Sequence, residues 1–124
     1  MGKAYGKTNW LVPDCYWPEM TGPGYYPSHE SICVLNTGEE DATVTMTLYF
    51  EDREPMTEFV ATCAAQRCHH VRMDKLKNKC GAGVPIGVPY AALVESNVPI
   101  VVQYSRIDTT QCNETLATTI GYAL

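Results

Sequence analysis

Long apolar runs are missing from this 124-residue sequence. A membrane-spanning helix needs roughly 20 apolar residues in a row, and no comparable run occurs here. The N-terminal segment carries Lys3 and Lys7 but no apolar stretch behind them, which argues against a secretory signal peptide. These absences predict a soluble, cytoplasmic protein.

Basic residues are also scarce. The chain has 9 lysines and arginines against 14 aspartates and glutamates, which gives a formal net charge of −5. A protein that binds a nucleic-acid backbone needs a concentrated positive surface. We therefore expect no nucleic-acid partner.

Signatures of catalysis are missing too. The sequence contains no Gly-x-Ser-x-Gly motif, no P-loop, no dinucleotide-binding fingerprint and no His-Glu-x-x-His motif. Ser28 and His29 are neighbours, but neighbouring side chains on a strand point to opposite faces. We expect a protein that is not an enzyme and that carries no cofactor.

Cysteine is plentiful by contrast, with 6 residues in the chain. In a reducing cytosol these thiols stay free and pack as small apolar side chains. One group contains residue types that bind zinc, although Cys-x₄-Cys is not a usual zinc spacing. We expect no metal site, and the alternative is a metal or redox role for the cluster Cys63, Cys68, His69, His70 and Cys80.

Strict alternation is the clearest structural signal. Val44, Met46, Leu48 and Phe50 alternate with polar residues and Tyr49, which predicts a strand with the first set facing a core. A strand over 31–35 precedes it, and the polar loop 36–41 predicts a hairpin between the two. Further strands are expected at 59–63, 68–72, 91–96, 98–106 and 115–122, with a helical turn at 74–77. The chain is thus predicted to be a single all-β domain over 1–124, an antiparallel β-sandwich of seven or eight short strands.

Charged and planar polar side chains on these strands are the candidates for a ligand site. An arginine or carboxylate on a sandwich strand is costly to bury unless it is paired, so such residues indicate a polar pocket or a salt bridge. A pocket for a sugar also needs aromatic rings, which Trp10, Trp17, Tyr25, Tyr26, Tyr90 and Tyr104 offer. We expect at least three of six candidates to share one pocket: His29, Glu30, Arg67, His70, Arg72 and Arg106. The alternative is a structural salt bridge between Glu30 and Arg72.

Several segments resemble the Anabaena sensory rhodopsin transducer family. The most specific is the octet Ser-Asn-Val-Pro-Ile-Val-Val-Gln at 96–103. The resemblance extends from Trp10 to Tyr122 and includes Ser28-His29-Glu30, the run 33–42, 49–55, Arg67 with His70-Val71-Arg72, Arg106, Asp108 and Thr118-Thr119-Ile120.

The resemblance implies a cytoplasmic β-sandwich that assembles as a homotetramer. It implies one of two functions: a sensor that binds a small polar metabolite, such as a sugar, and relays through protein contacts, or a dedicated partner for the cytoplasmic face of a membrane photoreceptor, a sensory rhodopsin. It assigns the pocket to the six candidates named above. The sequence departs from the family pattern at Cys63, Cys68 and Cys80 and in the glycine-rich loop 77–87.

Overall fold

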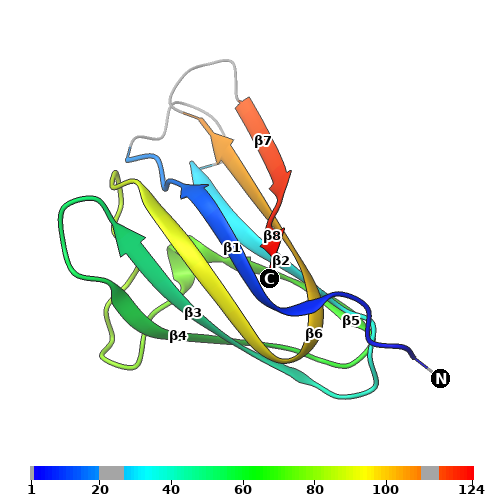
Figure 1. The fold of residues 1–124 in the computed structure, drawn as a ribbon. Coiled ribbons are helices and arrows are strands. Elements are labelled where there is room, and N and C mark those ends of the chain that lie inside the picture. Colours follow the sequence, from blue (N-terminus) through cyan, green and yellow to red (C-terminus); the bar gives the residue numbers. More distant parts are fainter. Residues whose placement is uncertain (1, 20–26, 110–114) are drawn as a thin grey trace.

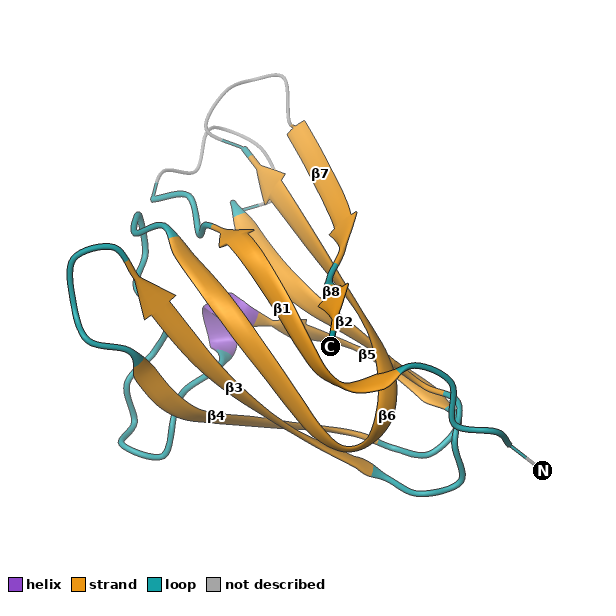
Figure 2. Cartoon of the chain, viewed as in Figure 1, coloured by secondary structure: helices purple, strands orange, loops and turns teal. Residues whose placement is uncertain are grey.

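The computed structural model describes residues 2–19, 27–109 and 115–124. Strands make up almost all of its regular structure, and a single 3₁₀ turn is the helical part of the described chain (Figure 2). The elements are β1 (Lys7–Cys15), β2 (His29–Asn36), β3 (Ala42–Phe50), β4 (Met56–Cys63), β5 (Arg67–Arg72), η1 (Met73–Lys75), β6 (Tyr90–Asp108), β7 (Thr115–Ile120) and β8 (Tyr122–Ala123). No helix in the described residues is long and apolar enough to cross a membrane.

All of the pairings are antiparallel and form two layers. Sheet A has the order β4-β3-β6-β1-β8, and sheet B has the order β5-β2-β6-β7. In the described residues the ladders end at β4 and β8 in one layer and at β5 and β7 in the other, so the sheets do not close into a barrel. The predicted fold class, an antiparallel β-sandwich, is confirmed.

Strand β6 is 19 residues long and belongs to both sheets. Its first half pairs with β1 and β3, and its second half pairs with β2 and β7. Figure 1 shows it curving from one layer into the other as its colour changes from yellow to orange. Ala92, Val94, Ile100 and Val102 are all fully buried, so the same side of the strand faces the core before and after the bend. The two strands expected at 91–96 and 98–106 are therefore one.

The bend fits the residues around it. Pro99 lies there, where a strand tolerates a residue without an N–H donor. Gly6, the residue before β1, lies close to the same place: its φ is +108°, and a β-carbon on it would lie 1.9 Å from the carbonyl oxygen of Ile100. Only glycine fits this position without moving the backbone.

The predicted alternation over 43–50 is confirmed. Val44, Met46 and Leu48 are fully buried, and Phe50 packs against the same core with part of its ring exposed. The strand at 7–15 was not among the expected elements. The predicted helical turn at 74–77 appears as η1, which shares Asp74 and Lys75 with the prediction. Met73, the first residue of η1, is buried.

The hairpin expected between 31–35 and the alternating strand is wrong. β2 pairs with β5 and β6 in sheet B, whereas β3 pairs with β4 and β6 in sheet A. The loop between them crosses from one layer to the other, and buried Asn36 fixes this crossing. Its side-chain amide donates to the carbonyl oxygens of Glu40 (2.8 Å) and Cys63 (3.1 Å) and accepts from the Gly38 N–H (3.0 Å).

Candidate functional site

Glu30 lies inside the sandwich with none of its surface exposed. It belongs to the inward row of β2, one step beyond the apolar Ile32. The hydroxyl of Tyr104 donates to Oε1 and the hydroxyl of Tyr90 donates to Oε2. The backbone N–H of Tyr16 donates to Oε1 over 3.1 Å. The buried carboxylate is thus fully hydrogen-bonded, as burial of such a group requires.

The protonation of this cluster is shifted by its surroundings. Burial raises the pKa of Glu30 above its usual range, while the donors Tyr104, Tyr90 and Tyr16 and the charge of Arg106 act in the opposite direction. Burial and the charge of Glu30 raise the pKa of both tyrosine hydroxyls.

The thiol of Cys15 lies beside the same cluster. Burial, followed by the charge of Glu30, raises the pKa of this thiol far above its usual value. Because the thiolate is the reactive form of cysteine, Cys15 is a packing residue rather than a nucleophile.

Arg106 follows Tyr104 on the inward row of β6 and is half-buried. Its guanidinium carbon lies 5.9 Å from the centre of the Tyr104 ring and 6.0 Å from the centre of the Tyr16 ring. Contacts at this distance are cation–π interactions, each contributing about 0.5–1 kcal/mol at a partly exposed site. Within the described part of the chain, the guanidinium has neither a hydrogen-bond acceptor nor an ion-pair partner.

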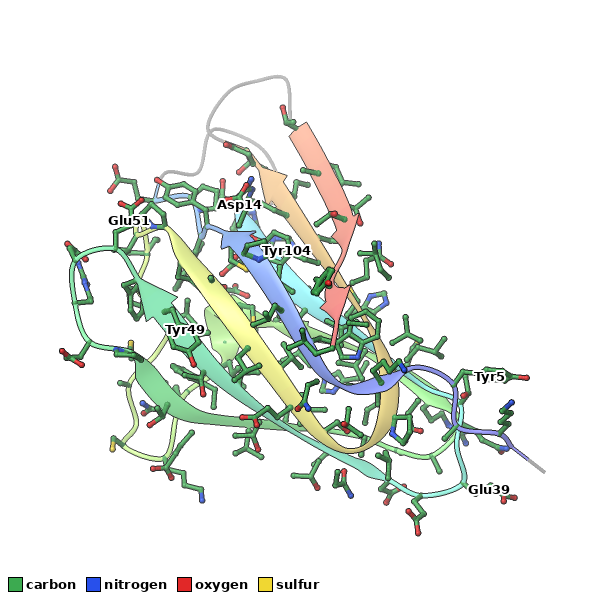
Figure 3. The ribbon with its side chains drawn as sticks, in the orientation of Figure 1. Tyr5, Asp14, Glu39, Tyr49, Glu51 and Tyr104 are labelled. Atoms are coloured by element: carbon green, nitrogen blue, oxygen red, sulfur yellow. The ribbon has the colours of Figure 1, made fainter. Side chains whose placement is uncertain are left out.

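Tyr104 and Arg106 border a cleft of about 540 Å³ between the two sheets. Tyr104 and Arg106 line it from the part of β6 in sheet B, and Asp14 lines it from β1 in sheet A. Figure 3 labels Tyr104 and Asp14. The remaining lining residues come from β1 and from the C-terminal strands, and they are mostly small or apolar: Val12, Pro13, Ala117, Thr118, Thr119, Ile120, Gly121 and Tyr122. The volume falls within the usual range for small-molecule sites, roughly 300–1,000 Å³.

The C-terminal strands β7 and β8 line this cleft together with β1 and β6. β7 pairs with β6 in sheet B, with Ala117 opposite Arg106 and Thr119 opposite Tyr104. The chain then crosses to sheet A at Gly121, whose N–H donates to the carbonyl oxygen of Val102 over 2.9 Å. A β-carbon on Gly121 would lie 3.2 Å from the Trp10 ring, so a larger residue would press on the core there.

Three of the predicted ligand residues lie on the outer face of sheet B instead. His70 of β5 is opposite Cys33, and Arg72 is opposite Ser31, which places both on the face opposite to that of Glu30. His29 shares this outer face and lines a groove of about 250 Å³ that also includes Ser31, Ser105 and Arg106. The expectation that His70 and Arg72 share a face is confirmed.

Arg67 lies at the far end of β5, opposite Asn36, and is exposed. Its guanidinium donates to the backbone oxygen of Gln66 over 3.0 Å. The structure therefore brings Glu30 and Arg106 together inside the sandwich and places the other four candidates outside the cleft, with His29 and Arg106 sharing the outer groove. The expected pocket with three of the six is not formed by the cleft, and ligand contacts from the other four stay predictions.

The suggested salt bridge between Glu30 and Arg72 is wrong. The register places Ser31, not Glu30, opposite Arg72, so the two charged side chains point to opposite faces. Arg72 instead forms a two-pronged ion pair with Asp74, with distances of 2.8 and 2.7 Å. Burial alone would raise the pKa of Asp74, but the hydrogen bonds and charge of Arg72 hold it below its usual range.

Of the predicted aromatic residues, Tyr104 lines the cleft. Tyr90 does not line it, but its hydroxyl donates a hydrogen bond to Glu30. Trp10 packs in the core, and its indole N–H donates to the carbonyl oxygen of Ile100 over 3.1 Å. Trp17 packs against the core from outside. Tyr25, Tyr26 and Cys112 lie outside the described residues.

The other five cysteines are free thiols in the structure. Among the described residues, no group of three or more His, Cys, Asp or Glu side chains is arranged to hold a metal ion. Cys63 is buried and donates to the carbonyl oxygen of Arg67 over 3.3 Å, while Cys68 and Cys80 are exposed.

Comparisons with known proteins agree with the β-sandwich. The family model of the Anabaena sensory rhodopsin transducer matches residues 5–123. A crystal structure of a Thermotoga maritima protein superposes with a TM-score of 0.85 at 40% sequence identity and covers 96% of each chain. The Anabaena sensory rhodopsin transducer superposes with a TM-score of 0.75 at 39% identity, over 89% of this chain and 96% of that chain. No curated protein matches the sequence.

Proposed function

Because the chain belongs to the Anabaena sensory rhodopsin transducer family, we propose that it is a cytoplasmic sensor or transducer domain that binds a small polar metabolite, such as a sugar, and relays the bound state through protein contacts. The observation that carries this proposal is the cleft between the sheets. It combines an apolar lining with a few polar groups, Asp14 and Arg106 on opposite walls, which is the usual composition of a small-molecule site.

The same cleft supports a role without catalysis. Among the residues that the structure describes, its lining contains one carboxylate, Asp14, and neither histidine nor cysteine. Glu30 has both oxygens occupied by donors behind Tyr104, so it is not presented to a substrate as an acid or base. We therefore infer that the ligand is bound and released unchanged.

A ligand screen with a blocked cleft tests this proposal. Neutral and acidic monosaccharides are added to the purified protein, and the midpoint of thermal unfolding is measured. A ligand present at 100 times its Kd stabilises the folded state by about 2.7 kcal/mol, which is a shift of several degrees for a domain of this size. Ala117→Trp fills the cleft from β7 and should remove the shift, because Ala117 lies opposite Arg106 on the lining.

The matched control is Thr43→Trp, which adds the same ring at an exposed position of β3, in the other sheet. It should respond to the ligand as the wild type does. If the ligand shifts the Ala117→Trp variant as much as the wild type, it binds elsewhere and the cleft is not the site. If no compound in the screen shifts the wild type, the metabolite-binding function is wrong.

The second candidate function, a dedicated protein-contact transducer for a sensory rhodopsin, is favoured by a different surface. Four apolar side chains on and after the last two strands are exposed by 57–69%; we call them the C-terminal apolar surface: Leu116, Ile120, Tyr122 and Leu124. Exposed apolar patches of this kind often mark protein interfaces. Ile120 and Tyr122 also line the cleft, so a ligand there would touch residues of the interface. This shared wall supports a relay between the two.

The same surface supports the proposed homotetramer. Leu116→Asp introduces a charge at its most exposed member and should dissociate the assembly, as measured by sedimentation velocity. The control is Ile86→Asp. Ile86 is an exposed apolar residue in a loop outside this surface, so the substitution should leave the assembly intact. A wild type that sediments only as a 13.7 kDa species would contradict the oligomer.

A further inference from the structure

The positive charge of the cleft comes from Arg106, whose N–H groups have no hydrogen-bond acceptor among the described residues. Arg106 is half-buried and is held by the faces of two tyrosine rings, yet within the described residues none of its five N–H groups has an acceptor. A guanidinium is planar and matches the two oxygens of a carboxylate. The arrangement therefore favours an anion arriving from the cleft.

Neutralising the buried Glu30 is the obvious alternative role for Arg106. The charge of Arg106 does lower the pKa of Glu30 through space. The oxygens of Glu30, however, are taken by Tyr90, Tyr104 and Tyr16, and no ion pair between Glu30 and Arg106 forms within 4 Å. Arg106 therefore lies beside Glu30 on the neighbouring strand, and its N–H groups donate to no acceptor in residues 2–19, 27–109 and 115–124.

The opposite wall adds a group of different chemistry. Asp14 is exposed, lines the same cleft and forms no ion pair with Arg106. An ionised carboxylate only accepts hydrogen bonds, so it suits the hydroxyl groups of a ligand and disfavours a second negative charge. Thr119, opposite Tyr104 on β7, adds another hydroxyl to the lining.

The charges of Arg106 and Asp14 favour a ligand with one negative charge over a dianion. In the described part of the chain, the lining holds one arginine, one aspartate and no lysine or histidine. A dianion such as a phosphate ester would carry more negative charge than Arg106 can match and would face Asp14 as well. A ligand with one carboxylate at one end and hydroxyl groups at the other fits both walls.

We infer that the ligand of the cleft is a small hydroxylated monocarboxylate of the sugar-acid type. Its carboxylate is bound by Arg106, and its hydroxyl groups donate hydrogen bonds to Asp14. This inference rests on the proposed metabolite-binding function and specifies the chemical class of its ligand.

Three probes with the same ring test the inference by titration calorimetry: glucuronate, glucose and glucose 6-phosphate. Glucuronate differs from glucose by a carboxylate in place of one CH₂OH group. A hydrogen-bonded charge pair of this kind corresponds to roughly a 10–100-fold difference in affinity. Glucuronate should therefore bind roughly 10–100-fold more tightly than glucose, and more tightly than the phosphate ester.

Variants assign that difference to Arg106. Arg106→Gln should reduce the affinity for glucuronate to about that for glucose, and Arg106→Lys, which keeps the charge without the planar fork, should fall between. Asp14→Asn should raise the ratio of glucuronate to glucose affinity because it removes the opposing charge. Arg53→Gln removes an exposed arginine outside the cleft, one paired with Asp52, and should leave the ratio unchanged.

Equal affinities for glucose and glucuronate, or an unchanged ratio in a folded Arg106→Gln or Arg106→Lys variant, would overturn the inference and leave a neutral sugar as the ligand. Tighter binding of glucose 6-phosphate would also overturn it in favour of a dianion. Binding of none of the three probes would overturn it together with the metabolite-binding function, so the outcomes separate the two proposals.

Discussion

The interior of the sandwich has two regions that are built by the same strands. Toward the bend of β6 it is apolar apart from the buried Asn36, and at the other end of the same strands it is polar. On β2 the inward row changes from Val34 and Ile32 to Glu30, and on β6 it changes from Val102 to Tyr104 and Arg106. We call these regions the apolar half and the polar end.

Alternation determines which side chains point inward in both regions, but not what they do there. In the apolar half the inward residues fill space, and any side chain of similar shape serves the same purpose. In the polar end each inward residue needs a partner, because an unpaired polar group in the interior costs free energy. Glu30 finds its partners on strands that are distant in the sequence, and Arg106 faces the cleft.

The largest effect is expected in the apolar half. Leu48→Ala removes a fully buried side chain and should lower the free energy of unfolding by about 2–5 kcal/mol. Thr45→Ala, on the outer side of the same strand, should change it by only about 0.5 kcal/mol. Urea denaturation of the three proteins measures both, and equal losses would mean that the inward row of β3 is misassigned.

A smaller effect is expected in the polar end. Glu30→Ala leaves the hydroxyls of Tyr90 and Tyr104 without their acceptor and should cost about 1–3 kcal/mol. The cost is limited because the substitution also removes a buried charge. Glu30→Gln keeps the shape and one acceptor, and the Tyr104 hydroxyl already lies 3.4 Å from the Tyr16 carbonyl oxygen as a second acceptor.

Glu30→Gln should therefore lose less stability than Glu30→Ala in the same denaturation experiment. If Glu30→Ala is as stable as the wild type, the hydrogen bonds of the polar end contribute nothing, and the contrast between the two regions fails.

The smallest effect is a dependence on pH. The pKa of Glu30 in the folded state is raised above its ordinary value of 4.5, so the folded protein binds this proton more tightly than the unfolded chain does. The resulting stability is fully present below pH 4.5 and is lost as the pH rises through the folded-state pKa.

The wild type should therefore gain stability relative to Glu30→Gln as the pH falls toward 4.5, by up to about 1.4 kcal/mol per pH unit within that window. Denaturation of both proteins between pH 4.5 and 8 measures the difference. The matched Leu48→Ala comparison should show no such trend, and a flat difference for Glu30→Gln would contradict the raised pKa.

Much of the fold follows from local patterns. The alternation of Val44, Met46 and Leu48 identified β3 correctly, because one face of that strand is buried and the other is wet. β1 was missed because Asn9 and Pro13 interrupt its pattern, and β6 was divided at Asn97, where a polar residue separates two largely apolar runs. The wrong hairpin has a related cause: the loop after Asn36 has the composition of a tight turn but crosses between layers.

The candidate site was predictable only in part. Glu30 and Arg106 were identified because charged residues on sandwich strands are costly to bury, and Tyr90 and Tyr104 because rings accompany polar sites. Asp14 was missed along with β1. The two tyrosine hydroxyls that donate to Glu30 lie 60 and 74 residues away in the sequence, so their contact depends on strand register, which no local pattern contains.

The dual membership of β6 also constrains the order of events during synthesis on the ribosome. Before β6 is made, the only ladders that the described strands can form are β3 with β4 and β2 with β5, since β1 pairs with β6 and β8 alone. Until residues 90–108 are synthesised, these strands can therefore form only two separate two-stranded ribbons, and β1 stays unpaired. Two-stranded ribbons are only marginally stable in water. Both layers, the core and the polar end then form together, late in translation and through contacts distant in sequence.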